Sequence, residues 1–188
     1  ELICSADENV VRDRAQDSLL KVCQLLEKPS ANTEFYQLVE RLSKGDLYSM
    51  RIASCYLLAN TYRKTFNSEV KDKLFKDLAI DDTPMVRRAI DINLGDFAEA
   101  IKYPISNVVE SYKTLLGDQQ DAVKIEALKN SCILSKLILE EPSTLQSEKE
   151  KQVEEDVLVS LVKASEDKKS WRLRFSVAEL LGELTQII

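Results

Sequence analysis

Five segments of the chain repeat one arrangement of polar and apolar positions. In each, a polar or acidic turn leads to an apolar residue, which is followed at once by arginine or lysine and then by apolar residues at helical spacing. The basic residues are Arg12, Arg51, Arg87, Lys124 and Arg174, at intervals of 39, 36, 37 and 50 residues. Apolar positions three and four residues apart lie on one face of an α-helix. The pattern therefore predicts five amphipathic helices at nearly regular intervals.

Each row of apolar positions along one helix face is called an apolar stripe below. The most regular stripe follows Pro84. Its apolar positions are Val86, Ile90, Leu94, Phe97 and Ile101, and they predict one helix that continues to residue 101. The other stripes are Val11, Ala15, Val22 and Leu25; Met50, Ser54, Leu57 and Leu58; Val123, Ala127, Leu134 and Ile138; and Leu173, Val177, Leu180, Leu184 and Ile188. We expect each stripe to form the buried face of its helix.

Four shorter helices are predicted between these, at about residues 33–43, 68–80, 105–116 and 151–165. Each repeat is then a pair of antiparallel helices, and the chain holds about four and a half repeats: 1–28, 29–66, 67–103, 104–141 and 142–188. Pairs of this length bury their apolar faces only by stacking on neighbouring pairs. We therefore expect one all-α domain over residues 1–188, a right-handed α-solenoid.

The length of the repeat limits the kinds of helical repeat that the chain can contain. Two helices in about 37 residues fit three kinds of helical repeat, and the signatures of tetratricopeptide and ankyrin repeats are missing, which leaves the HEAT repeat. The last interval is longer, and its extra residues lie in the charged stretch 140–151. We predict a solvent-facing loop there, with a docking loop as the alternative.

Composition agrees with this fold and narrows the function. Four glycines and four prolines are too few for the turns of a β-sandwich or barrel. The net charge of −6 argues against nucleic-acid binding, which needs a basic face. No apolar run approaches the length of a membrane helix. We predict that neither nucleic acid nor a membrane is a partner.

The chain contains no histidine, and it therefore lacks the commonest general base and the commonest metal ligand. No glycine-rich phosphate loop is present. We predict that the protein is not an enzyme, with no catalytic residue, cofactor or metal site.

The cysteines suggest a reducing compartment. Cys4, Cys23, Cys55 and Cys132 are widely spaced within helical patterns, which predicts buried free thiols. We expect a cytoplasmic protein, with a nuclear location also open. Because the chain does not begin with methionine, we expect a fragment of a longer protein.

The basic residue of each repeat is expected to be structural. It lies one residue past the first position of the stripe, at the flank of the helix, where it can reach an acidic turn residue of its own or a neighbouring repeat. Its recurrence in all five repeats indicates a structural ladder, which is a series of contacts between basic residues and acidic turn residues along the repeats, and not a binding site. Thr83 and Pro84 are predicted as the N-cap and first residue of their helix.

Arg88 and Trp171 lie off the apolar stripes, and two interpretations stay open for each. Tryptophan and arginine are frequent interface hot spots. Alternatively, Trp171 packs against an adjacent repeat, and Arg88 is solvated beside Asp81 or Asp82. The turns that join the helices of each repeat, at residues 7–9, 46–48, 81–85, 118–121 and 168–172, are expected to form a ridge along one edge of the solenoid. Such a ridge is suited to binding another protein.

Two segments carry a family resemblance. Residues 81–89, Asp-Asp-Thr-Pro-Met-Val-Arg-Arg-Ala, with residues 94–95 and 97–98, resemble one HEAT repeat of the scaffolding (A) subunits of protein phosphatase 2A. Residues 166–174, Glu-Asp-Lys-Lys-Ser-Trp-Arg-Leu-Arg, resemble the repeat two units later. The remaining repeats are matched in order by residues 10–15 with 18–19, residues 42–46 with Arg51, and residues 120–124. The resemblance covers essentially the whole chain, as about repeats three to seven.

The resemblance implies a non-catalytic scaffold whose intra-repeat turns bind regulatory (B-type) subunits. It also implies that the catalytic subunit binds only C-terminal repeats, which this chain lacks. By the resemblance, the residues that engage regulatory subunits are Pro84, Met85, Arg88, Ser170, Trp171 and Arg172. Ridge positions that match less closely are Glu8, Asp46, Tyr48, Gln120 and Asp121.

Three departures from the family pattern indicate a divergent member, and one of them is the greater length of the region 140–151. Leu47 and Tyr48 stand where the family usually has two aromatic residues. An extra lysine within residues 167–170 lengthens the spacing from Asp167 to Arg174. The alternative function is a HEAT-repeat adaptor of a transport or translation class, which would hold an extended peptide on its concave face.

Overall fold

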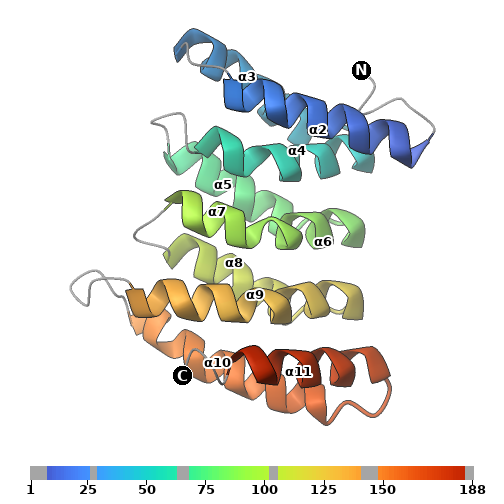
Figure 1. The fold of residues 1–188 in the computed structure, drawn as a ribbon, viewed down its shortest axis with the longest axis vertical. Coiled ribbons are helices and arrows are strands. Elements are labelled where there is room, and N and C mark those ends of the chain that lie inside the picture. Colours follow the sequence, from blue (N-terminus) through green and yellow to red (C-terminus); the bar gives the residue numbers. More distant parts are fainter. Residues whose placement is uncertain (1–7, 26–28, 63–67, 102–105, 141–147, 185–188) are drawn as a thin grey trace. The chain divides into compact units, whose positions relative to one another are not determined.

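The computed structural model describes residues 8–25, 29–62, 68–101, 106–140 and 148–184. All regular secondary structure in these ranges is helical, and successive helices form side-by-side pairs (Figure 1). The prediction of an all-α fold built from helix pairs is confirmed. None of the described helices is both long and apolar enough to cross a lipid bilayer.

The chain folds as two compact units, Glu1–Asn93 and Leu94–Ile188. The helices of the first unit are α2 (Asn9–Leu25), α3 (Pro29–Ser43), α4 (Tyr48–Tyr62), α5 (Ser68–Ala79) and α6 (Pro84–Ile92). Helix α4 is central, since it packs against each of the other four. Its buried residues include Leu57 and Leu58, which are fully enclosed.

The second unit has the same construction. Its helices are α7 (Leu94–Ile101), α8 (Ser106–Leu116), α9 (Asp121–Glu140), α10 (Glu148–Ser165) and α11 (Trp171–Leu184). Helix α9 packs against α7, α8, α10 and α11. Tyr112, Leu115, Val123 and Leu134 are fully buried in its core. The stacking of all repeats into one solenoid domain stays a prediction.

The helices that carry the repeated motif all begin in the same register. Helices α2, α4, α6, α9 and α11 start three residues before the basic residue of their repeat, at Asn9, Tyr48, Pro84, Asp121 and Trp171. The extra lysine before Trp171 is therefore accommodated in the turn and does not shift the helix. The phase of the repeat read from the sequence is confirmed.

Most predicted stripes are buried, but that of the first helix is not. In α2, Val11, Val22 and Leu25 are 41%, 49% and 80% exposed, whereas Cys23 is 2% exposed. Helix α2 packs on α4, and within the described residues no helix precedes it to cover its other side. The prediction that these three residues are buried is wrong, because a stripe is buried only where a neighbour meets it.

The helix predicted from Pro84 to residue 101 is interrupted at Asn93. Helix α6 ends at Ile92, and α7 begins at Leu94. The Asn93 side chain donates to the carbonyl of Ala89 at 2.7 Å, and asparagine side chains that bond nearby carbonyls compete with regular helix. The residues of the stripe are still buried up to Phe97.

Both ends of the stretch 140–151, where a loop was predicted, are helical. Glu140 is the last residue of α9, and residues from Glu148 onward belong to α10. Residues 141–147 lie outside the described residues.

The cysteine prediction is confirmed where the structure describes it. Cys23, Cys55 and Cys132 are buried free thiols, and Cys4 lies outside the described residues. Burial raises the pKa of the Cys55 thiol, which makes it unreactive.

Candidate functional site

Arg51 organises two turns of the first unit. Its Nε donates to Asp81 Oδ2 at 2.7 Å, and its Nη1 donates to the carbonyl of Gly45 at 2.8 Å. Longer bonds reach the Asp46 carbonyl at 3.1 Å, Asp81 Oδ1 at 3.3 Å and Thr83 Oγ1 at 3.1 Å. One side chain thus joins the turn at 44–47 to the turn of the next repeat. The predicted ladder between neighbouring turns is confirmed at this position.

Arg87 and Arg174 bond the backbones of their own turns. Arg87 Nη1 donates to the carbonyl of Asp81 at 2.6 Å, and Arg174 Nη1 donates to the carbonyl of Asp167 at 2.5 Å. Lys124 Nζ lies 3.9 Å from Asp121 Oδ1. The two arginines therefore reach the backbone of the acidic residue, where the sequence suggested its carboxylate. These contacts fix the turn backbones from within.

Thr83 occupies the N-cap position as predicted, but its hydroxyl does not cap the helix. Thr83 Oγ1 instead accepts the bond from Arg51. The Asp81 carboxylate accepts from the Thr83 backbone N–H at 2.8 Å, which closes the turn. Pro84 is the first residue of α6, where proline is favoured.

The predicted docking residues of the first unit lie on these turns and face solvent. Met85 is 58% exposed and Tyr48 is 48% exposed. Glu8, Asp46, Pro84 and Arg88 are also exposed. Exposure of Arg88 agrees with its predicted orientation away from the apolar stripe. Met85 and Arg88 are three residues apart in the first turns of α6, which places them on neighbouring parts of one helix face.

The second unit presents two further turns. Gln120 and Asp121 are exposed, and the Gln120 backbone N–H donates to Asp118 Oδ1 at 2.8 Å. In the other turn, Asp167 Oδ1 accepts from the backbone N–H groups of Ser170 and Lys169, both at 2.7 Å. These two bonds lower the pKa of the Asp167 carboxyl, and the bond from Ser170 has the larger effect.

Trp171 is exposed and not packed into the core. It is 62% exposed, and the Arg172 guanidinium lies 5.6 Å from the centre of its ring. That distance is in the range of a cation–π contact. Ser170 beside it is partly buried, and its hydroxyl accepts from the Leu173 N–H at 3.4 Å. Within the described residues, the alternative that Trp171 packs into the fold is wrong.

The chemistry of these turns is suited to binding. They present a methionine, a tryptophan, two arginines and several amides and carboxylates on backbones fixed by internal hydrogen bonds. Among the described residues, no group of three or more side chains is arranged to hold a metal ion. Each unit presents its own group of exposed turn residues, and their alignment into one ridge stays a prediction.

Sequence reasoning missed two features. Lys71 belongs to a predicted helix, but it is 1% exposed and donates to the Thr61 carbonyl at 3.1 Å. Three lysines from separate helices, Lys113, Lys124 and Lys163, line one pocket of the second unit. Neither feature has a local sequence signal, because both depend on which helices pack together.

Comparison with known proteins gives relatives along the whole chain. No protein-family model matches. The chain is 29% identical over 198 residues to the regulatory A subunit of protein phosphatase PP2A from Saccharomyces cerevisiae, which covers 98% of this chain and 29% of the relative. It is 32% identical to a Caenorhabditis elegans protein named a probable serine/threonine-protein phosphatase PP2A regulatory subunit, over 73% of this chain and 24% of the relative.

A third relative carries a more specific name. The protein phosphatase 2A scaffold subunit of Dictyostelium discoideum is 38% identical over 105 residues, covering 54% of this chain and 18% of the relative. The chain therefore spans less than a third of the length of these relatives. The resemblance found in the sequence motifs is confirmed. The chain belongs among the homologues of the scaffolding (A) subunits of protein phosphatase 2A, over a segment of their length.

Proposed function

We propose that this chain is a segment of a non-catalytic phosphatase 2A scaffold, which docks a regulatory B-type subunit through its intra-repeat turns. The names of its relatives describe regulatory and scaffold subunits. The observation that carries the proposal is a contrast within the turns before α6 and α11. Arg87 and Arg174 bond the backbones of these turns, while Met85 and Trp171 remain 58% and 62% exposed.

A backbone that is already fixed does not have to be ordered on binding, which lowers the entropic cost and favours affinity. Trp171 offers the largest exposed ring of the described residues, and Arg172 already lies against it. The catalytic subunit is proposed to bind other repeats of the full scaffold. Within this proposal the chain acts by geometry, since it holds a regulatory subunit near a separately bound catalytic subunit. We also propose a cytoplasmic location, which imaging of the tagged protein would test.

Calorimetry with a purified B-type regulatory subunit tests the docking proposal. Arg88→Ala and Trp171→Ala are each expected to weaken binding by about 1–3 kcal/mol, the range of interface hot spots. Lys136→Ala and Leu139→Ala are the matched controls, because both residues are exposed near the opposite end of α9 from its turn. Circular dichroism should show all four variants folded.

Two results would contradict the proposal. One is a folded wild-type chain that binds no regulatory subunit. The other is binding that is indifferent to Arg88 and Trp171 but is lost when residues of the second helices are changed. The second result would favour the adaptor alternative, with an extended peptide on the concave face.

A further inference from the structure

The second unit contains a pocket of about 410 Å³ between α8, α9, α10 and α11. Its apolar lining includes Leu128 and Leu173, which are 2% exposed, and the half-buried Leu116. Val159 lies at an exposed position, 44% accessible to solvent. The pocket therefore has an apolar floor that can be reached from outside.

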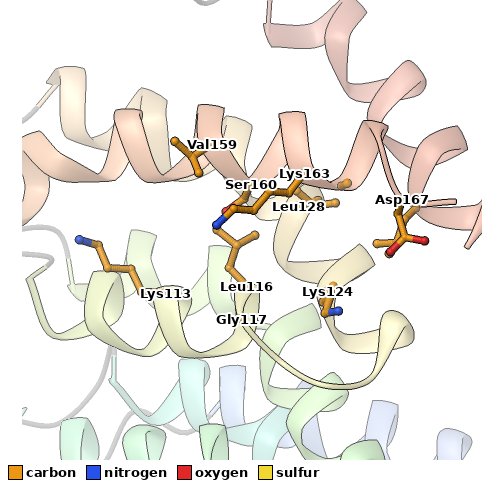
Figure 2. Close-up of a pocket in the computed structure, with 11 residues that line it drawn as sticks. Lys113, Leu116, Gly117, Lys124, Leu128, Val159, Ser160, Lys163 and Asp167 are labelled. Carbon is orange, nitrogen blue, oxygen red and sulfur yellow. The ribbon is translucent and has the colours of Figure 1, made fainter. Parts of the chain in front are cut away.

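Three lysines surround this floor. Figure 2 shows Lys163 extending from α10 toward Leu116, with Lys113 on one side and Lys124 on the other. Each of the three comes from a different helix, so the packing of the helices brings the charges together. The concentration of positive charge is unusual in a chain whose net charge is −6.

Asp167 is the only carboxylate among the lining residues, so one negative charge stands against the three lysines. Its Oδ1 accepts from the backbone N–H groups of Lys169 and Ser170, both at 2.7 Å. Lys124 Nζ lies 3.9 Å from Asp121 Oδ1, and its positive charge also helps to lower the pKa of Asp167. Among the residues that the structure describes, Lys163 has no ion-pair partner. Positive charge therefore remains available to an external anion.

We propose that this pocket binds a polypeptide segment in which an acidic side chain lies next to an apolar one. The lysines would contact the carboxylate, while the floor of Leu116, Leu128 and Leu173 would cover the apolar side chain. A fully polar anion such as a phosphate would leave that floor unused. Burial of apolar area supplies much of the affinity of a peptide segment, and the charges provide selectivity.

The position of the pocket indicates the source of the segment. Gly117 and Asp167 belong to the two turns of the second unit that carry Gln120, Asp121 and Trp171. A partner that docks on these turns can therefore also place a segment in the pocket. That source rests on the proposed function, whereas the peptide chemistry of the pocket stands on its own geometry.

Nuclear magnetic resonance titration of the whole chain tests the inference. The probe is a capped peptide of sequence Ser-Gly-Glu-Leu-Glu-Leu-Gly-Ser, compared with the same peptide carrying Gln for Glu and with inositol hexakisphosphate. The Glu peptide should shift the amide signals of Gly117, Ser160 and Ala164 at millimolar concentration. The Gln peptide should bind at least about tenfold more weakly, because each lost carboxylate removes an attraction to the lysines.

Charge-reversed variants localise the binding. Lys163→Glu should lower the affinity for the Glu peptide by about tenfold, since the attraction between residue 163 and the peptide carboxylates becomes a repulsion. Lys129→Glu makes the same charge change at an exposed position of α9 outside the pocket, and it should leave binding unchanged. Equal loss in both variants would overturn the inference, as would the absence of any shift at the pocket amides. Equal or tighter binding of inositol hexakisphosphate at these amides would assign the pocket to a polar anion and also overturn it.

Calorimetry with the regulatory subunit separates this inference from the proposed function. If the regulatory subunit binds and the Glu peptide does not, the pocket inference fails alone. If the Glu peptide binds and the regulatory subunit does not, the docking proposal fails alone. Weaker binding of both by Lys163→Glu would support the pocket as part of the docking surface.

Discussion

Replacing Arg51 with methionine should lower the stability of the first unit markedly. Arg51 and Asp81 form the tie between two turns, and their side chains are only 18% and 11% exposed. Methionine keeps most of the aliphatic length but removes all donors to Asp81, Gly45 and Thr83. The substitution leaves the largely buried Asp81 carboxylate and three further acceptors, the carbonyls of Gly45 and Asp46 and Thr83 Oγ1, without this partner.

The magnitude follows from these contacts. Hydrogen bonds to charged groups each contribute about 1.5–3 kcal/mol, and removal of one member of a buried ion pair costs about 3–5 kcal/mol. Because this pair is partly solvated, we expect a loss near the lower limit, about 3 kcal/mol. Asp81→Asn should cost less, since its amide oxygen can still accept from the Thr83 N–H.

Urea denaturation of the whole chain, followed by circular dichroism, measures this loss. Lys44→Met is the control, because Lys44 pairs with Glu40 at 2.7 Å but the two side chains are 70% and 36% exposed. An exposed pair of this kind should contribute less than about 1 kcal/mol. If Arg51→Met is no more destabilising than Lys44→Met, the structural ladder interpretation is refuted. A double variant, Arg51→Met with Asp81→Asn, should be less destabilised than the sum of the two, because the residues are in contact.

Two further predictions concern Lys71 and the glycines. Burial lowers the pKa of Lys71 from 10.5 to about 8, although neighbouring Asp72 opposes the shift. The unfolded state therefore binds more protons between about pH 8 and 10.5, and the free energy of unfolding should rise with pH by about 2 kcal/mol from pH 7 to 9.5. The Lys71→Met variant should lack this rise. If the free energy of unfolding changes with pH in parallel for the two proteins, Lys71 is not the group responsible. Gly45→Ala should destabilise the chain by about 1 kcal/mol or more, since its new Cβ would lie 2.8 Å from Met50 Cβ. Gly182→Ala in α11 should stabilise by about 0.5–1 kcal/mol, since among the described residues no atom beyond its own stretch of helix lies within 4 Å of the added Cβ. Thermal denaturation that gives both changes the same sign would refute this contrast.

The helices and their phase were predictable from the pattern of residues alone. The spacing of apolar residues behind each basic residue is local, and a helix reproduces that spacing wherever the chain folds. The stripe that follows Trp171 predicted helix α11, but the extra lysine left the register of the preceding turn open until the structure placed the helix start at Trp171. The position of Arg88 away from the buried stripe was also predictable from its angle around the helix, whereas the exposure of Trp171 was one of two open interpretations.

Which faces are covered, and which distant groups meet, depended on how the helices pack. Val11 and Leu25 have the same apolar character as residues of the other stripes, yet they are exposed because burial depends on a neighbouring helix. The bond from Arg51 to Thr83 spans 32 residues, and the lysines of the pocket come from three helices. Such contacts depend on the distance between packed elements, which a linear pattern of residue types does not specify.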